Sequence, residues 1–167
     1  MNKIQTFRAQ KDEFFEFGDQ SPLTPDQKKE FEGLNYYPVR EDFRFELEVE
    51  KYTEPQEIQM QTSTGDLRTF TRFGRVTFEV DGLSASLTIF SNEHGFFVPF
   101  VDAGAGKVTY GAGRYLDPEL NEAGNLVLDF NLAYNPYCAY NDLYSCPIPP
   151  AENRLSVAIK AGEMNFK

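Results

Sequence analysis

A glycine-rich segment at residues 102–115 carries the first group of residues that could do chemistry. It reads Asp-Ala-Gly-Ala-Gly-Lys-Val-Thr-Tyr-Gly-Ala-Gly-Arg-Tyr, with glycines at 104, 106, 111 and 113. Glycine permits positive φ angles and close backbone approach, so the amides of this loop and Arg114 can receive an anion. No Gly-Lys-Ser/Thr sequence opens a helix here, so it is not a phosphate loop. The structural alternative is two tight turns around a short strand at 107–110.

Asp129 and Asn131 form a second candidate group. They alternate with Leu128 and Phe130, so on a strand both polar side chains would point to one face. An enclosed carboxylate requires a cation or several donors, and the planar guanidinium of Arg114 suits that role. We therefore expect Arg114 and Asp129 to meet in a sheltered pocket. A solvated strand face or a purely structural ion pair is the alternative.

Residues 134–150 are the third feature, because they contain four tyrosines, four prolines and both cysteines. The prolines prevent a helix or an interior strand and stiffen the segment, which predicts an ordered loop. Tyrosine combines an apolar ring with a polar tip, and long ordered loops often bind ligands. We refer to residues 134–150 below as the Tyr/Pro-rich loop.

Cys138 and Cys146 lie eight positions apart within this loop. Two buried thiols are favoured for a reducing compartment, whereas a disulfide, a redox pair or metal ligation with carboxylates are the alternatives. A nucleophilic Cys138 would need a base, and His94 is the one histidine of the chain. One histidine and two cysteines are too few for a usual Cys/His zinc site.

These segments together predict a pocket, formed by residues 102–163, that binds a small polar or anionic molecule. An enzyme that uses the same pocket is the alternative, with Asp129 or Glu163 as general base and Arg114 as electrostatic stabiliser. A structural or interaction domain, in which these residues brace the long loop, is the second alternative. No pattern identifies a cofactor, no metal-ligand spacing stands out, and the oligomeric state is left open. The predicted ligand-binding residues are Asp102, Arg114, Tyr115, Asp129, Asn131, Asn135, Tyr140 and Asn153.

Two short helices are predicted at the N-terminus. Thr24, Pro25 and Gln27 have the spacing of a capping box with proline at the first helical position, which predicts a helix at roughly 25–32. A first amphipathic helix, ending near Gly18, is indicated by residues at helical spacing: Ile4, Phe7, Lys11, Phe14 and Phe15.

A period of two begins at Phe43 and predicts strands from there onward. Alternation or apolar runs mark strands at 43–50, 58–60, 67–80, 96–101, 126–133 and 155–159, with Pro99 at an edge or a bulge. Asp81-Gly82 favours a type I′ hairpin that pairs Val80 with Leu83. The predicted fold is α+β, mainly antiparallel β: a sandwich or barrel-like sheet of about seven strands after two short helices.

Length and charge limit the classes of protein. The 167 residues fit one domain, with a helical segment 1–33 packing on the sheet and a β domain at 40–167. The net charge of −10 repels the phosphates of nucleic acids and anionic lipids, so neither nucleic acid nor a membrane is an expected partner. The first twenty residues mix charges with aromatics and lack the apolar stretch of a signal peptide. We expect a soluble cytoplasmic protein.

Several blocks of the sequence resemble the domain of unknown function 1684 family. Its N-terminal half is matched at 21–23 and 31–38, and its C-terminal half at 110–116, 128–131, 134–136, 138–140, 146–147 and 153–155. The resemblance covers nearly the whole chain and implies no established activity, substrate or cofactor. Members typically carry Thr-Ser-Gly after the aspartate that matches Asp102, where this chain has Gly104-Ala105-Gly106. A mechanism that needs those hydroxyls is therefore not expected here.

Overall fold

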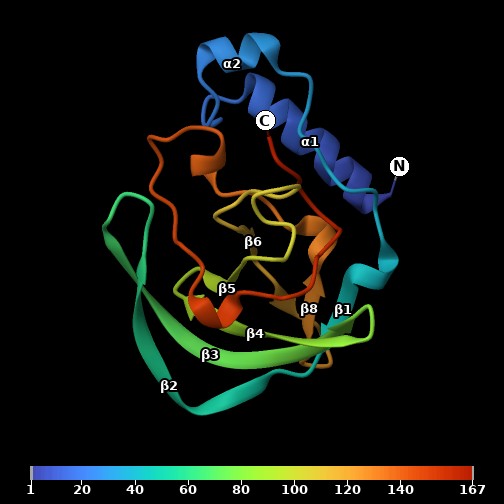
Figure 1. The fold of residues 1–167 in the computed structure, drawn as a ribbon, viewed down its shortest axis with the longest axis vertical. Coiled ribbons are helices and arrows are strands. Elements are labelled where there is room, and N and C mark those ends of the chain that lie inside the picture. Colours follow the sequence, from blue (N-terminus) through green and yellow to red (C-terminus); the bar gives the residue numbers. More distant parts are fainter. Residues whose placement is uncertain (1, 167) are drawn as a thin grey trace.

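Two helices precede the strands in the computed structural model, which describes residues 2–166. Helix α1 spans Lys3–Phe17 and helix α2 spans Pro25–Glu30, and both lie at one end of the molecule (Figure 1). Each begins with a capping box, from Asn2 to Gln5 in α1 and from Thr24 to Gln27 in α2. Both predicted helices are confirmed, although α2 ends two residues earlier than expected.

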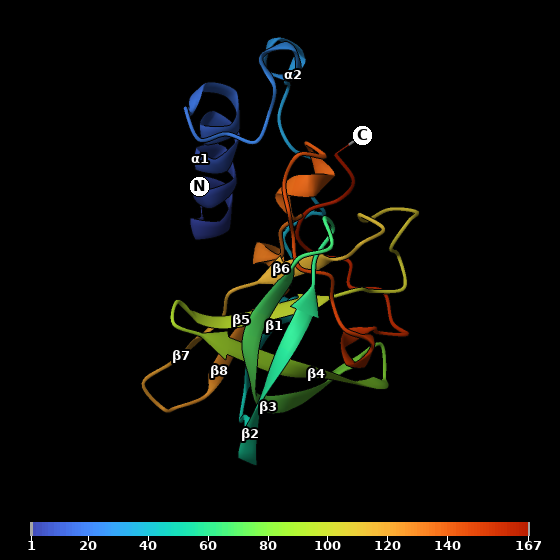
Figure 2. The ribbon, with the colours of Figure 1, turned by 90° about the vertical axis from the view of Figure 1, so that its left-hand side faces the viewer.

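The strands form two antiparallel sheets. The larger sheet has the order β2-β3-β4-β5-β6, with β2 (Glu50–Gln61), β3 (Leu67–Val80), β4 (Leu83–Asn92), β5 (Gly95–Phe100) and β6 (Arg114–Leu116). The smaller has the order β1-β8-β7, with β1 (Arg44–Leu47), β8 (Leu126–Asp129) and β7 (Glu119–Leu120). The mainly antiparallel, sandwich-like fold is confirmed, and the sheets do not close into a barrel (Figures 1 and 2).

The β3–β4 hairpin has the predicted register. Val80 pairs with Leu83, and Val76 pairs with Leu87. Asp81 has a φ of 52° and Gly82 a φ of 79°, as the two central residues of a type I′ turn require. This register places the apolar faces of both strands against the core.

The main core lies between the two sheets and includes a C-terminal segment without regular structure. Fully buried residues come from β4, β8 and the short 3₁₀ helix η2 (Phe130–Leu132), among them Leu87, Leu128 and Phe130. Residues 155–161 pack against this core through Leu155, Val157, Ile159 and Ala161. The strand predicted at 155–159 is wrong, because this segment has no regular strand partner and Ile159 donates its N–H to a side chain, the carboxylate of Asp102.

The helices form a second apolar cluster with the Tyr/Pro-rich loop. Phe15 of α1 packs with Leu23, Leu34 and Tyr140, and Phe166 lies beside them. The helical segment thus packs mainly on this loop and on the C-terminal segment instead of on the face of a sheet, and Figure 2 shows α1 set apart from the strands. None of the helices within residues 2–166 combines the length and apolar character that crossing a membrane requires.

Candidate functional site

Arg114 begins β6 and is buried, with a side-chain exposure of 1%. Gly113 before it has a φ of 102°, and a Cβ there would lie 2.5 Å from the carbonyl oxygen of Phe100. Glycine therefore allows the chain to turn at this point and to direct the guanidinium inward. Of the four glycines expected to permit positive φ, Gly106 and Gly113 have it.

The guanidinium of Arg114 is held mainly by backbone carbonyls of the C-terminal segment. Nη1 donates to the carbonyl oxygens of Ala161 at 2.5 Å and Glu163 at 3.0 Å, and Nη2 donates to that of Ile159 at 3.0 Å. Burial lowers the pKa of Arg114, and the nearby Asp102 opposes this shift. These contacts suit the bracing role, and the role of Arg114 in ligand binding stays a prediction.

The expected pairing of Arg114 with Asp129 is wrong. The carboxylate beside Arg114 belongs to Asp102, whose Oδ2 lies 3.6 Å from Nη2. Asp102 also accepts hydrogen bonds from the Thr109 hydroxyl at 2.9 Å and from the Ile159 amide at 2.8 Å. The reason lies in the topology: β6 pairs with β5, the strand that leads to Asp102, whereas Asp129 ends β8 in the other sheet.

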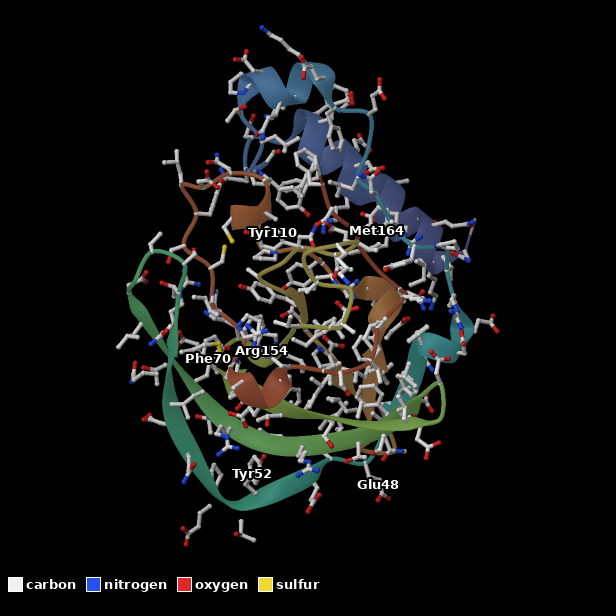
Figure 3. All side chains as sticks on the ribbon, viewed as in Figure 1. Glu48, Tyr52, Phe70, Tyr110, Arg154 and Met164 are labelled. Atoms are coloured by element: carbon white, nitrogen blue, oxygen red, sulfur yellow. The ribbon has the colours of Figure 1, made fainter. Side chains whose placement is uncertain are left out.

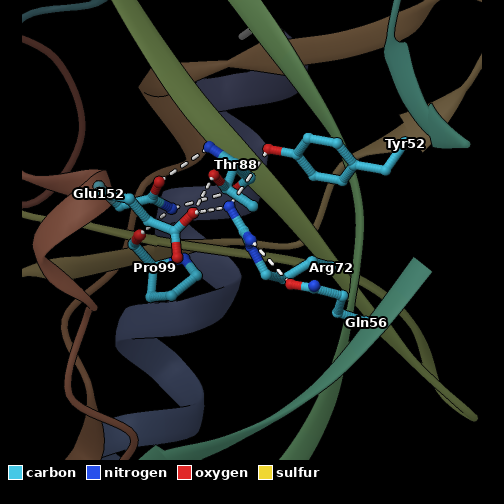
Figure 4. A network of polar contacts seen from close by, with 7 residues as sticks. Tyr52, Gln56, Arg72, Thr88, Pro99 and Glu152 are labelled. Atoms are coloured by element: carbon cyan, nitrogen blue, oxygen red, sulfur yellow. Dashed lines mark hydrogen bonds and ion pairs between the residues drawn. The ribbon is translucent and has the colours of Figure 1, made fainter. Parts of the chain in front are cut away.

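Asn153 ties β4 to β5 through its side-chain amide, and Figure 4 shows Thr88 and Pro99, the residues of these two strands that it joins. Its Oδ1 accepts from the N–H of Thr88 at 2.8 Å, and its Nδ2 donates to the carbonyl oxygens of Thr88 at 3.0 Å and Pro99 at 2.8 Å. The register that pairs Phe90 with Phe97 would place Thr88 opposite Pro99, which has no N–H to donate. The buried amide of Asn153 replaces the missing ladder bonds, so Pro99 does lie at an interruption of the sheet.

Asn131 uses its amide in a similar way on the other side of the molecule. Its Oδ1 accepts from the Arg40 N–H at 2.9 Å, and its Nδ2 donates to the Arg40 carbonyl at 2.7 Å. Asp129 accepts from the backbone and side-chain N–H groups of Asn131 at 3.0 and 2.9 Å. The two side chains do not alternate on a strand as predicted, because η2 begins at Phe130 and Asp129 caps it.

Glu163, Tyr140 and Asn135 are brought together beneath α1. The carboxylate of Glu163 is 1% exposed, forms an ion pair with Lys11 of α1 and accepts a hydrogen bond from the Tyr140 hydroxyl. Asn135 donates to the carbonyl oxygen of Met164 at 3.1 Å. Burial, together with Glu163, raises the pKa of Tyr140. Figure 3 shows Met164 between the helices and the sheets, where this group closes the space below α1.

Replacing Glu163 with glutamine is expected to lower the free energy of unfolding by about 2–3 kcal/mol, because it leaves Lys11 half-enclosed without its counter-charge. Chemical denaturation followed by circular dichroism measures the change. Glu13→Gln, on the exposed side of α1, is the matched control and should change stability by less than about 0.5 kcal/mol. Equal effects of both substitutions would contradict a structural role for the buried pair.

A cleft of about 800 Å³ opens between α1, β5 and the Tyr/Pro-rich loop. Its cationic groups are Lys11 and Arg68, and Arg68 is oriented by a hydrogen bond to the carbonyl oxygen of Ser145 at 2.6 Å. Its walls are largely aromatic, with rings from Phe7, Phe70, Phe97, Tyr115, Tyr137 and Tyr144. Of the predicted binding residues, Tyr115 lines this cleft, so the predicted site is divided among several places.

A second cleft, of about 740 Å³, lies under the N-terminal end of α1 and contains Asp129 and Asn131. Asp117, which follows β6, lines both clefts. The Tyr134 hydroxyl donates to its carboxylate at 2.5 Å. Surrounding protein atoms raise the pKa of the exposed Asp117 carboxyl, and the Tyr134 hydrogen bond opposes that shift. Asp117 is thus a carboxylate at the boundary of the two clefts, held by the hydrogen bond from Tyr134.

Sequence reasoning missed Lys11, Arg68 and Asp117 as site residues. A signal for Lys11 was present, because it occupies the apolar face of its helix, where a charged group needs a buried partner. Arg68 is one of many charged residues on exposed strands, and Asp117 follows a short strand that was not predicted. Neither had a distinguishing local pattern.

The fold and clefts define a sandwich-like antiparallel β protein with an aromatic cleft bordered by α1. Residues 29–164 match the family described as "Protein of unknown function (DUF1684)", and the chain belongs to this family. It is also similar to the solution NMR structure of an uncharacterised protein from gene locus rrnAC0354 of Haloarcula marismortui. The two share 37% identity with a TM-score of 0.72, covering 97% of this chain and 92% of that one. No curated protein matches.

Proposed function

We propose that the protein binds a small molecule with an aromatic or apolar body and an anionic group. The observation that carries this proposal is the 800 Å³ cleft, because its walls are largely aromatic and its lining includes the cationic side chain of Arg68. Ligand sites are typically concave, mainly apolar and supplied with a few oriented polar groups. The volume of this cleft lies within their usual range.

The charge distribution also supports an anionic group on the ligand. The chain carries a net charge of −10, yet the guanidinium of Arg68 lines the cleft, whereas the charge of Lys11 is already balanced by Glu163. Arg68 is exposed and donates one hydrogen bond to the loop, so other N–H groups of its planar guanidinium remain available for a carboxylate or phosphate. An anionic ligand would then be attracted by short-range contacts in the cleft, although the net negative charge of the protein repels it at longer range.

A titration with small aromatic carboxylates and aromatic phosphates, followed by ¹H–¹⁵N NMR, tests this proposal. We expect shift changes at the residues that line the cleft, and a dissociation constant about tenfold weaker in Arg68→Gln, because a charge-assisted hydrogen bond is lost. Arg75→Gln, on the same strand but outside the cleft, is the matched control and should bind as the unmodified chain does. Binding that is indifferent to Arg68→Gln, or absent for both classes of compound, would overturn it.

Catalysis in the same cleft is a second candidate function, favoured by the Asp117–Tyr134 pair. A carboxyl with a raised pKa beside a bound molecule is suited to general acid–base chemistry. Asp117 takes this role in place of Asp129, which lines the second cleft, and of Glu163, whose buried carboxylate is paired with Lys11. For any compound found to bind and react, Asp117→Asn is expected to abolish turnover while binding persists. Unchanged turnover in that variant would remove Asp117 from the chemistry.

A further inference from the structure

Cys138 and Cys146 lie side by side at the edge of the Tyr/Pro-rich loop. The Cys138 N–H donates to the sulfur of Cys146 at 3.3 Å, so the Cys146 sulfur lies against the backbone of Cys138. Cys138 is partly exposed, whereas Cys146 is buried and lines the 800 Å³ cleft. Cys138 is therefore the more exposed of the two neighbouring cysteines.

The polypeptide on either side holds the two residues in place. Cys138 lies in the 3₁₀ helix η3 (Tyr137–Ala139). Cys146 is fixed to the β2–β3 turn, where its N–H donates to the Ser63 hydroxyl at 3.1 Å and its carbonyl accepts from the Ser63 N–H at 2.9 Å. Packing and hydrogen bonding therefore hold the two cysteines in position before any bond between their sulfurs forms.

The surroundings of the pair distinguish the two thiols. Hydrogen bonds from the Cys146 thiol and, at 3.7 Å, the Tyr110 hydroxyl lower the pKa of Cys138 to about 6, although partial burial opposes this. The hydrogen bond to Cys138 and burial raise the pKa of Cys146. The other titratable or charged groups nearby are Tyr115, Arg68 and Asp142. The two pKa shifts have opposite directions, so Cys138 ionises more readily than Cys146.

Within residues 2–166, no group of three or more His, Cys, Asp or Glu side chains gathers at one point. The two thiols therefore lack the further protein ligands of a zinc site. A thiolate with a second thiol in contact is the arrangement of an oxidisable pair, in which one sulfur attacks and the other resolves.

We propose that Cys138 and Cys146 form a dithiol site that reduces a hydroperoxide and becomes an intramolecular disulfide. The Cys138 thiolate attacks the terminal oxygen of the hydroperoxide, so an S–O bond forms and the O–O bond breaks. The departing alkoxide or hydroxide takes a proton from solvent. The sulfur of Cys146 then attacks the sulfenic sulfur, an S–S bond forms, and the S–O bond breaks with release of water that carries the Cys146 proton. An external dithiol restores both thiols by exchange.

Hydrogen peroxide and the reduced full-length chain test this proposal. We expect both free thiols to disappear together, the intact mass to fall by two hydrogens, and dithiothreitol to reverse the change. The reaction should be about tenfold slower near pH 5 than near pH 7, because the thiolate fraction of Cys138 falls.

Single substitutions separate the two roles. Cys146→Ser should still react, but it should stop at a sulfenic acid on Cys138 that dimedone traps. Cys138→Ser should react at least about tenfold more slowly, because the remaining thiol is buried and protonated. Disulfide-linked dimers, equal rates in the two variants, or folded chain that keeps both thiols under peroxide while unfolded chain loses them would each overturn the proposal. These outcomes are independent of ligand binding, because they are read from the thiols alone.

Discussion

Arg114→Met is expected to lower the free energy of unfolding by about 3–5 kcal/mol. Methionine matches the length of the arginine stem but leaves the carbonyl oxygens of Ile159, Ala161 and Glu163 without their donors. It also leaves the buried carboxylate of Asp102 without the cation 3.6 Å away. Small domains have a total stability of about 5–15 kcal/mol, so this loss is a large fraction of it. Urea denaturation monitored by circular dichroism measures the change.

Arg154→Met is the matched control for this experiment, because Arg154 is exposed and close in sequence to the same segment. It should alter stability by less than about 0.5 kcal/mol. Arg114→Lys keeps the charge but not the planar fork, so an intermediate loss is expected. If Arg114→Met had the stability of the unmodified chain and only ligand binding were lost, Arg114 would be a binding residue and the bracing role would be wrong.

Asn153→Ala is expected to cost about 2–4 kcal/mol. The substitution leaves the N–H and carbonyl of Thr88 and the carbonyl of Pro99 buried without partners, and each unsatisfied group costs about 1–3 kcal/mol, though not additively. Hydrogen exchange supplies a local measurement, since the Thr88 amide should lose protection before amides elsewhere in β4.

Two further variants make this result specific. Asn153→Asp puts an oxygen in place of the Nδ2 donor, facing the two carbonyl oxygens, so at neutral pH it should destabilise more than Asn153→Ala. Asn125→Ala, in the turn before β8, should have little effect. If Asn153→Ala left both the denaturation midpoint and the Thr88 exchange rate unchanged, the amide would not hold β4 and β5 together.

The elements predicted best are those whose signals are complete within a few residues. The capping box of α2 joins Thr24 to Gln27, and the type I′ turn joins Val80 to Leu83; both are present as expected. Such signals depend on hydrogen bonds and φ angles between near neighbours, so distant parts of the chain hardly alter them.

The segment at 155–159, which was predicted as a strand, shows what a hydrophobic pattern does and does not report. Leu155, Val157 and Ile159 are buried, as their alternation indicated. Their backbone nevertheless forms no strand, because the pairing with Val101 stops at one isolated parallel bridge at Arg154 and Ile159 donates its N–H to the Asp102 carboxylate. Alternation reports which side chains face the core and leaves the partners of the backbone open.

The site was predicted as one pocket, and the structure distributes its residues among several places. Arg114 and Glu163 do lie together, through the Glu163 carbonyl; Tyr140 donates to the Glu163 carboxylate, and Asn135 donates to the carbonyl oxygen of the next residue, Met164. Asn153 lies instead at the β4–β5 join. Polar residues that brace a fold and polar residues that bind a ligand have the same composition, so sequence alone did not separate them.

The sequence by itself determined the two helices, the capping box of α2, the β3–β4 register and the antiparallel class. Only the tertiary structure decided that Asp102 is the carboxylate beside Arg114, that Lys11 pairs with Glu163, and that the Cys146 sulfur lies against the Cys138 N–H. The physical reason is that the partner of a buried charge depends on which strands and helices become neighbours. Lys11 and Glu163, 152 positions apart, meet only after the whole chain has packed.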